Sequence, residues 1–279
     1  MSTQEQFNKS TSEIYRKISK HVPEIEWKIH APLIEKINKL KKEKNAVILA
    51  HNYQTPEIYH GVSDIAADSL ALAVEAAKTS ADVIVLCGVH FMAETAKLMS
   101  PNKKVLIPDM DAGCSLAASL TGEDVRLLKK KYPGVPVVSY VNTSADVKAE
   151  TDVCCTSANA VKVVESLKTD KVIFLPDQHL ANYVAKQTKV KIISWKGSCI
   201  VHEQFSPKEI QDIRKANPGI KVIGHPECPA EVLDACDFAG STGGMISYVK
   251  KNQPKKVMLV TECSMSDNVQ ADNPNVAFL

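Results

Sequence analysis

Short apolar runs rich in β-branched residues alternate along the chain with Ala-rich stretches of helical periodicity. "AVILA" (46–50) is a run of the first kind, and "SLALAVEAAKTS" (69–80) is a stretch of the second. The apolar runs have the length of strands and stop at polar residues, which predicts β-strands. The Ala-rich stretch begins at Ser69, a residue type that favours helix N-termini. The alternation predicts parallel βαβ units with helices on both faces of the sheets.

The same pattern occurs three times along the chain. Three strand-and-loop segments are alike: "AVILAHNYQ" (46–54), "VPVVSYVNT" (135–143) and "IKVIGHPEC" (220–228). A second motif aligns Asp64, Asp152 and Asp237 at steps of 88 and 85 residues, and a third aligns Val83, Val172 and Val257 at steps of 89 and 85. Repeats of this length indicate one supersecondary unit copied along the chain. We predict an α/β fold of three similar αβα sandwich (Rossmann-like) domains.

The repeat also sets the expected domain boundaries. We expect an N-terminal helical segment at 1–45, a first repeat at 46–125, a second at 126–205 and a third, incomplete at its end, at 206–279. Each unit is expected to contain three strands. Ligands of such sheets collect beyond the carboxyl ends of the strands, so the residues after each strand are the candidates for a site.

The first loop of each unit carries two polar side chains at equivalent places. These pairs are His51 and Tyr53, Tyr140 and Asn142, and His225 and Glu227. Strand ends are often polar simply because they leave the core, but three loops with hydrogen-bonding or titratable groups favour a shared site. A tyrosine and a glutamate from different units could move protons, provided that burial raises the pKa of the glutamate. Histidine and asparagine suit the binding of carboxylates or carbonyls.

The second loop of each unit opens a helix with small polar residues. The loops contain Asp68–Ser69, Thr156–Ser157 and Ser241–Thr242–Gly243–Gly244. Ordinary N-capping explains at least part of each group. The functional alternative is anion binding, because hydroxyls and free amides at a helix N-terminus hold phosphate or carboxylate. "GSTGG" is the strongest case, since its glycines allow close approach of the backbone.

Cys114 and Cys199 follow the last strands of the first two units and are 85 residues apart, which is the repeat step. Their equivalent places after small residues favour one shared function, and His202 lies three residues beyond Cys199. A pseudo-threefold protein with one cysteine per unit would hold a metal cluster on its axis. A further step of 85 residues gives position 284, so we expect the third cysteine beyond Leu279. Cys87 and Cys236 are expected to be packing residues, while Cys228 and Cys263 could lie near the site face.

Composition excludes several other classes of protein. The chain has 279 residues, 44% of them hydrophobic, and a net charge of +2 from 34 basic and 32 acidic residues, so nothing indicates nucleic-acid or membrane binding. It contains no apolar run long enough for a transmembrane helix and no apolar core of a secretory signal. Eight cysteines without such a signal indicate a reducing cytosol, and therefore a cytoplasmic protein.

Several motifs together resemble the quinolinate synthase family, the A protein of bacterial NAD biosynthesis. They are "AHNYQ", "DAGCSLA", "SYVNTSADVKAETDVCCTSANA", "LPDQHLA", "GSCIVHE", "HPEC", "GSTGGM" and "VTECSM", within roughly residues 30–279. The resemblance implies three αβα domains around a pseudo-threefold axis. It also implies condensation of iminoaspartate with dihydroxyacetone phosphate to quinolinate, with loss of phosphate and two waters. L-aspartate oxidase would be a possible functional partner.

The resemblance further implies a [4Fe–4S] cluster held by three cysteines, whose open iron acts as a Lewis acid. Cys114 and Cys199 look like two of the ligands, and Tyr53 and Glu227 look like the proton-transfer pair. The residues that look like substrate contacts are His51, Ser69, Tyr140, Asn142, Ser157, His202, His225, Ser241 and Thr242.

The third cysteine of the family, in a "CPxM"-like segment after the "TECSM" region, is not in this sequence. Three explanations compete: a truncated sequence, which we favour, substitution by Cys263, or a cluster-poor homologue. Two other functions stay open on the residues alone. One is a truncated dicarboxylate- or phosphate-binding protein without turnover. The other is a zinc-dependent aldol-type lyase with cysteine and histidine ligands.

Overall fold

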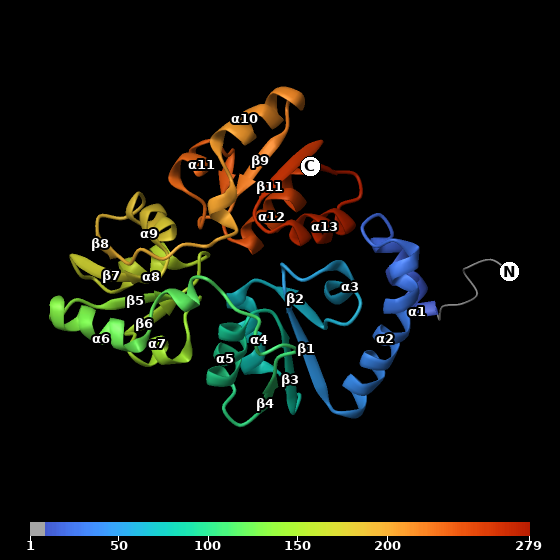
Figure 1. Cartoon of the computed structure of the whole chain (residues 1–279), viewed down its shortest axis with the longest axis horizontal. Coiled ribbons are helices and arrows are strands. Elements are labelled where there is room, and N and C mark those ends of the chain that lie inside the picture. Colours follow the sequence, from blue (N-terminus) through green and yellow to red (C-terminus); the bar gives the residue numbers. More distant parts are fainter. Residues whose placement is uncertain (1–8) are drawn as a thin grey trace.

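Three αβα units surround the centre of the molecule, and each is built on its own four-stranded sheet (Figure 1). This computed structural model describes residues 9–279, so the first eight residues of the predicted N-terminal segment lie outside the described residues. All strand pairs within the three sheets are parallel. The predicted fold class is confirmed. The strands of each sheet fall within one predicted repeat, while the domain boundaries themselves stay predictions.

The three sheets have the same strand order, which is second, first, third, fourth in the sequence of each unit. The first sheet contains β1 (Ala46–His51), β2 (Ile65–Ala67), β3 (Val83–Cys87) and β4 (Lys104–Leu106). The second contains β5 (Val137–Tyr140), β6 (Val153–Cys155), β7 (Lys171–Leu175) and β8 (Lys191–Ser194). The third contains β9 (Lys221–Gly224), β10 (Phe238–Ala239), β11 (Lys256–Val260) and β12 (Ala277–Phe278).

The expectation of three strands per unit is wrong, because each sheet has a fourth, short edge strand. In the first unit this strand is β2, which pairs with β1 from Leu49↔Ile65 to His51↔Ala67. β6 and β10 occupy the same place beside β5 and β9. These strands contain two or three residues, too few to show the alternation that identifies a strand in a sequence.

Helices connect the strands and cover both faces of the sheets, as parallel pairing requires. In the first unit they are α3 (Pro56–Tyr59), α4 (Ser69–Lys78) and α5 (His90–Met99). In the second they are α6 (Gly122–Lys131), α7 (Ala145–Ala149), α8 (Ala160–Ser166) and α9 (Gln178–Ala185). In the third they are α10 (Pro207–Ala216), α11 (Ala230–Asp234), α12 (Thr242–Asn252) and α13 (Cys263–Asp272). Short 3₁₀ helices occur at Ala117–Ser119 and His202–Gln204.

The sequence sets where these helices begin. Thr121 and Ser206 each form a capping box with an acidic residue three positions on, which fixes the starts of α6 and α10. Asp68 caps α4 by accepting a hydrogen bond from the amide of Ala71. The strand-to-helix loops are thereby held in one conformation, and the site residues lie on these loops.

Two helices, α1 (Lys9–Ile18) and α2 (Glu24–Glu43), precede the first strand. Ile18 and Trp27 are fully buried in an apolar cluster with residues of β1, so these helices cover one face of the first sheet. Among residues 9–279, no helix has the length and apolar character needed to cross a bilayer.

The first two units share one core of buried apolar side chains, and the third unit is not part of it. One cluster runs without interruption from Leu49 and Leu86 in the first unit to Val138 and Phe174 in the second. The third unit has two clusters of its own, one on each face of its sheet. Polar side chains therefore provide much of its attachment to the first two units.

Candidate active site

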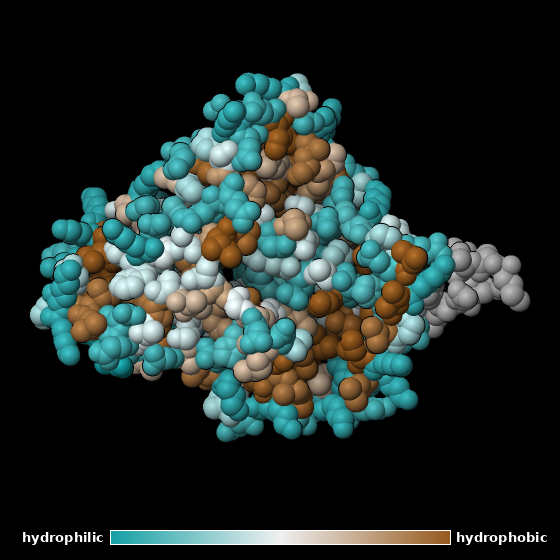
Figure 2. Space-filling model, viewed as in Figure 1, coloured by the Kyte–Doolittle hydropathy of each residue, from teal (hydrophilic) through white to brown (hydrophobic). Residues whose placement is uncertain are grey.

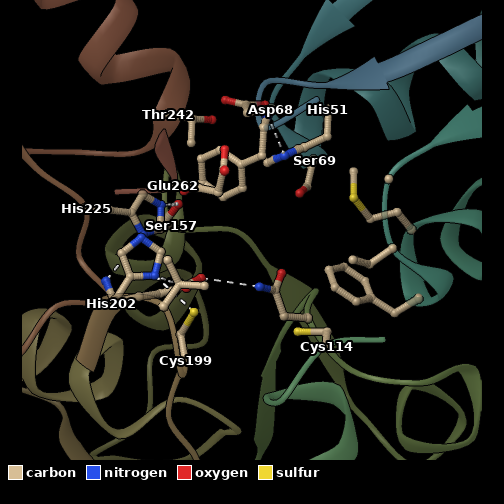
Figure 3. A pocket seen from close by; sticks show the side chains of 18 of the residues that line it. His51, Asp68, Ser69, Cys114, Ser157, Cys199, His202, His225, Thr242 and Glu262 are labelled. Carbon is tan, nitrogen blue, oxygen red and sulfur yellow. Dashed lines mark hydrogen bonds and ion pairs between the residues drawn. The ribbon is translucent and has the colours of Figure 1, made fainter. Parts of the chain in front are cut away.

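A cavity of about 310 Å³ lies where the three units meet, and its lining includes residues from the loops after the strands of all three sheets. Figure 2 shows a small opening in the surface at this place, between the three units. Volumes of this size suit small organic ligands. All but one of the predicted site residues line the cavity: His51, Tyr53, Ser69, Cys114, Tyr140, Asn142, Ser157, Cys199, His202, His225, Glu227 and Thr242. Figure 3 shows most of them converging from opposite walls.

His51 and His225 occupy equivalent places at the carboxyl ends of β1 and β9 and are held in the same way. In each case the backbone amide two residues later donates to Nδ1, from Tyr53 at 3.3 Å and from Glu227 at 3.4 Å. Burial lowers the pKa of His51 to about 4 and that of His225 to about 3, so both rings are neutral. Because Nδ1 accepts, the proton of each ring is on Nε2. Both histidines can therefore donate a hydrogen bond to an anion or carbonyl without adding a charge.

A continuous chain of hydrogen bonds joins Tyr53 to Glu227. The Tyr53 hydroxyl lies 2.5 Å from Oγ1 of Thr261, and this oxygen lies 2.9 Å from Nε2 of His202. The other ring nitrogen of His202 lies 3.0 Å from Oε2 of Glu227. The second oxygen of Glu227 accepts from the Tyr140 hydroxyl at 2.6 Å and from the Asn142 amide at 3.2 Å. The predicted proton-transfer pair is thus connected through two other side chains.

The expectation that burial raises the pKa of Glu227 is wrong. Burial alone would raise it, but hydrogen bonds from His202 and Tyr140 outweigh burial and hold the pKa well below its ordinary value. Burial, together with the charge of Glu227, raises the pKa of both Tyr53 and Tyr140 well above their usual range. Glu227 is therefore an ionised acceptor, and the two phenols keep their protons.

The second loops contribute hydroxyls from all three units. Ser69, Thr156, Ser157 and Thr242 line the cavity, and the hydroxyl of Ser157 lies 3.3 Å from Nε2 of His225. Ser241 is the predicted site residue that does not line it, because its hydroxyl caps α12 by accepting from the amide of Gly244. Capping thus accounts for Ser241, as the alternative interpretation held.

Gly243 of "GSTGG" lies where the third unit closely approaches the first. A Cβ atom added to Gly243 would lie 2.7 Å from Oδ2 of Asp68, which is closer than a carbon can come to an oxygen. Nearby, Nδ2 of Asn52 donates to Oγ1 of Thr242 at 2.9 Å. The start of α12 therefore packs directly against the loops of the first unit, and both sides of this contact line the cavity through Asp68 and Thr242.

Cys114 and Cys199 are half-buried and line the same cavity (Figure 3). Burial raises the pKa of both thiols. Cys199 Sγ lies 3.0 Å from Nδ1 of His202. Cys199, His202 and Glu227 have ligand atoms within 4.8 Å of one another, a grouping suited to a metal ion. Two thiols from equivalent loops beside such a group fit a metal centre, because metal binding deprotonates a buried thiol.

The other four cysteines discussed from the sequence do not line the cavity. Cys87 is buried between the first sheet and the N-terminal helices, and Cys236 packs in the third unit, as expected. Cys228 is fully buried in the same cluster as Cys236. Cys263 is exposed at the start of α13, so within residues 9–279 it does not line the cavity with the other two thiols.

Sequence reasoning missed an apolar wall and an acidic residue of the cavity. Val89, Phe91 and Met92, which follow β3, form the wall, and Glu262 follows β11. It also missed the link through Thr261. These residues come after the third strand of their units, so the repeat that placed the other loops gives the signal that could have found them. Among the described lining residues there is no lysine or arginine.

Comparison with known proteins decides the family. Residues 35–279 match the family described as "Quinolinate synthetase A protein". The chain belongs to this family. It is 60% identical over 271 residues to quinolinate synthase of Sinorhizobium fredii (strain NBRC 101917 / NGR234), covering 97% of this chain and 76% of the relative. It is 61% identical over 273 residues to quinolinate synthase of Caulobacter vibrioides (strain NA1000 / CB15N), covering 96% and 74%. It is 63% identical over 246 residues to quinolinate synthase of Xylella fastidiosa (strain 9a5c), covering 88% of this chain and 73% of the relative.

The quinolinate synthase family predicted from the sequence motifs is thus confirmed, and with it an enzyme of NAD biosynthesis. These relatives favour the synthase over the alternative of a binding protein without turnover.

Proposed function

We propose that the cavity joins iminoaspartate to dihydroxyacetone phosphate and forms quinolinate, with loss of phosphate and two waters. The observation that carries the proposal is the chain Tyr53–Thr261–His202–Glu227 beside two cysteines, all on loops of three different units. Condensation and dehydration of two carbonyl-type substrates require proton transfers, and this chain lies on the wall of a cavity of suitable size. Family membership supports the same reaction.

Both substrates are anions, and the lining would bind them through neutral donors. The Nε2–H groups of His51 and His225 and the hydroxyls of Ser69, Ser157 and Thr242 point to carboxylate or phosphate oxygens as partners. The N-termini of α4 and α12 add partial positive charge at Ser69 and Thr242. Donors without a full charge hold an anion while leaving it free to depart, which suits the loss of phosphate. Tyr140 and Asn142 act by orienting Glu227.

Tyr53 is the group that takes and returns protons at the substrate. Because Glu227 is ionised and accepts only, the Nδ1 of His202 carries the proton that faces it, and Nε2 of a neutral ring accepts from Thr261. When the Tyr53 oxygen takes a proton from the substrate, the hydroxyl proton of Tyr53 passes to Thr261. The hydroxyl proton of Thr261 then passes to Nε2 of His202. Glu227 then stabilises the imidazolium, as the carboxylate does in a Ser–His–Asp triad.

Cys114 and Cys199 would hold a [4Fe–4S] cluster at the edge of the cavity. An open iron supplies Lewis acidity toward a carbonyl or hydroxyl oxygen of the substrate. The loops that carry the two cysteines follow β4 and β8, and β12 has the same place in the third sheet. By this symmetry, a third ligand would belong to the loop after β12. Iminoaspartate would come from an L-aspartate oxidase, and the reaction would take place in the cytoplasm.

Metal and sulfide analysis after anaerobic purification tests the proposed centre. Where a third ligand completes the set, we expect about four irons and as much sulfide per chain. Cys199, His202 and Glu227 alone could take a single zinc ion, so the zinc-dependent lyase predicts zinc without sulfide. That second result would overturn the cluster. It would leave the hydrogen-bonded chain from Tyr53 to Glu227 to be tested by turnover.

A further inference from the structure

One hydroxyl links the two cysteine loops. The Oγ of Ser115 donates to the backbone oxygen of Ser198 at 3.0 Å and accepts from the backbone amide of Ile200 at 3.2 Å. These two backbone groups lie immediately before and after Cys199, while Ser115 immediately follows Cys114. The Ser115 side chain, next to Cys114, thus contacts the backbone on both sides of Cys199.

Away from the thiols, the start of the Cys199 loop has one other hydrogen bond to the Cys114 loop, from Nε1 of Trp195 to the backbone oxygen of Ser119 at 3.1 Å. Its remaining bonds lie within its own unit. Gly197 donates its amide to the oxygen of Pro176 at 3.1 Å, and its own oxygen accepts from the amide of Gln178 at 2.9 Å. These bonds hold the start of the loop beside the end of β7. They do not determine where the loop lies relative to the first unit. Ser115 supplies a contact between units at the thiols themselves.

The contact made by Ser115 has no symmetric counterpart in the second unit. The residue that corresponds to Ser115 in the second unit, one step of 85 residues later, is Ile200. Its side chain is 65% exposed and has no hydroxyl, and its part in the contact is the backbone amide. Beside the two thiols, the spacing of the cysteine loops therefore depends on Ser115 rather than on a pair of symmetric contacts.

We propose that Ser115 is a positioning residue that sets the spacing of Cys114 and Cys199 and so retains the metal centre. The inference rests on the proposed function, because it assigns both thiols to one centre. Partners that orient metal ligands typically contribute 10–100-fold to metal affinity. Loss of the hydroxyl frees the Cys199 loop to move against Cys114, which raises the rate at which the centre opens and loses iron.

The test compares Ser115→Ala with Ser115→Thr, which keeps the hydroxyl, and with Ser166→Ala. Ser166 is a matched control, because its exposed hydroxyl at the end of α8 donates only within its own helix, to the oxygen of Val163 at 2.7 Å. Two quantities are measured on the holoenzyme: the rate of iron release to a chelator, and the hydrogen exchange of the Ile200 amide. The exchange is also measured on the metal-free protein, where it reports the Ser115 contact without the centre.

Ser115→Ala is expected to release iron about tenfold faster than the wild type and to expose the Ile200 amide to exchange. Ser115→Thr and Ser166→Ala are expected to match the wild type. The inference is overturned if the wild type holds the centre and Ser115→Ala releases iron at the same rate. Unchanged exchange of Ile200 in the metal-free variant would overturn it as well. A wild type that binds no iron or sulfide would contradict the proposed function, and the inference with it.

Discussion

The Nδ1 of His202 lies 3.0 Å from Oε2 of Glu227, and both side chains are almost fully buried, at 1% and 5% exposed. His202 comes from the loop after β8 and Glu227 from the loop after β9, so the contact joins the second unit to the third. An ionised carboxylate held against an imidazole fixes which ring nitrogen carries the proton. With the proton on Nδ1, the Nε2 of His202 can accept a proton from Thr261.

Replacement Glu227→Gln should lower turnover at least about a hundredfold, because an uncharged amide cannot stabilise a protonated His202. Iron content should stay that of the wild type. Steady-state rates and metal analysis on the same preparation measure both. Glu231→Gln is the control, since Glu231 is exposed on α11. Normal turnover in the Glu227 variant would remove Glu227 from proton transfer.

Replacement Thr261→Val should lower turnover about tenfold to a hundredfold without unfolding the protein, because the valine methyl cannot pass a proton between Tyr53 and His202. Thr261→Ser keeps the oxygen and should restore most of the rate. The measurement is the rate at saturating substrates, with circular dichroism to check the fold. Equal rates in the valine and serine variants would show that the hydroxyl carries no proton.

Asp177 should make the protein less stable as the pH rises. Its side chain is fully buried, one oxygen caps α9 through the Leu180 amide at 2.7 Å, and the other has no hydrogen-bond partner within the described residues. Burial raises the pKa of Asp177 from 3.8 to about 8. Between these values the folded state binds more protons than the unfolded state, so the free energy of unfolding falls as the pH rises toward 8.

Asp177→Asn keeps a capping oxygen and removes the titration. The stability of Asp177→Asn relative to the wild type should therefore increase with pH. The difference between their free energies of unfolding should be about 1–3 kcal/mol larger at pH 8 than at pH 5. Urea unfolding at the two pH values measures the difference. Asp177→Ala, which loses the cap, should be less stable than Asp177→Asn at both. If the free energies of unfolding of the wild type and Asp177→Asn depend on pH in the same way, the pKa of Asp177 is not raised in the folded protein.

Asn268 should hold the third unit to the first. Its Nδ2 donates to the backbone oxygens of Asn52 at 3.3 Å and Gln54 at 2.7 Å, on either side of Tyr53. Asn268→Ala leaves both oxygens without this donor and should lower the free energy of unfolding by about 1–3 kcal/mol. It should also slow turnover through Tyr53. Asn252→Ala, which loses one bond on the exposed part of α12, should cost less than about 1 kcal/mol. Equal losses in the two variants would contradict a special role for Asn268.

Much of the architecture follows from local sequence. The strands β1, β5 and β9 are β-branched runs that end at polar residues, and the repeat step places His51, Tyr140 and His225 at the carboxyl ends of these strands, around the central cavity. Those features are local, so periodicity reveals them. The edge strands β2, β6 and β10 are too short to give a periodic signal, and pairing with a neighbouring strand is what makes them strands.

The site was predicted as a set of residues but not as a network. Tyr53 and Glu227 were paired by their chemistry, whereas Thr261 and His202 lie between them in space. The pKa of Glu227 depends on hydrogen bonds from three neighbours in other loops, and no local pattern encodes these partners. Ser241 shows the converse, because its capping bond is local and the sequence had already offered that explanation.

Quinolinate formation by the anaerobically purified chain, with its metal centre loaded, tests the central claim most directly. The account predicts quinolinate and phosphate in equal amounts when iminoaspartate and dihydroxyacetone phosphate are both present, and neither product when one substrate is omitted. A chain that holds the iron–sulfur centre but makes no quinolinate from the two substrates would contradict it.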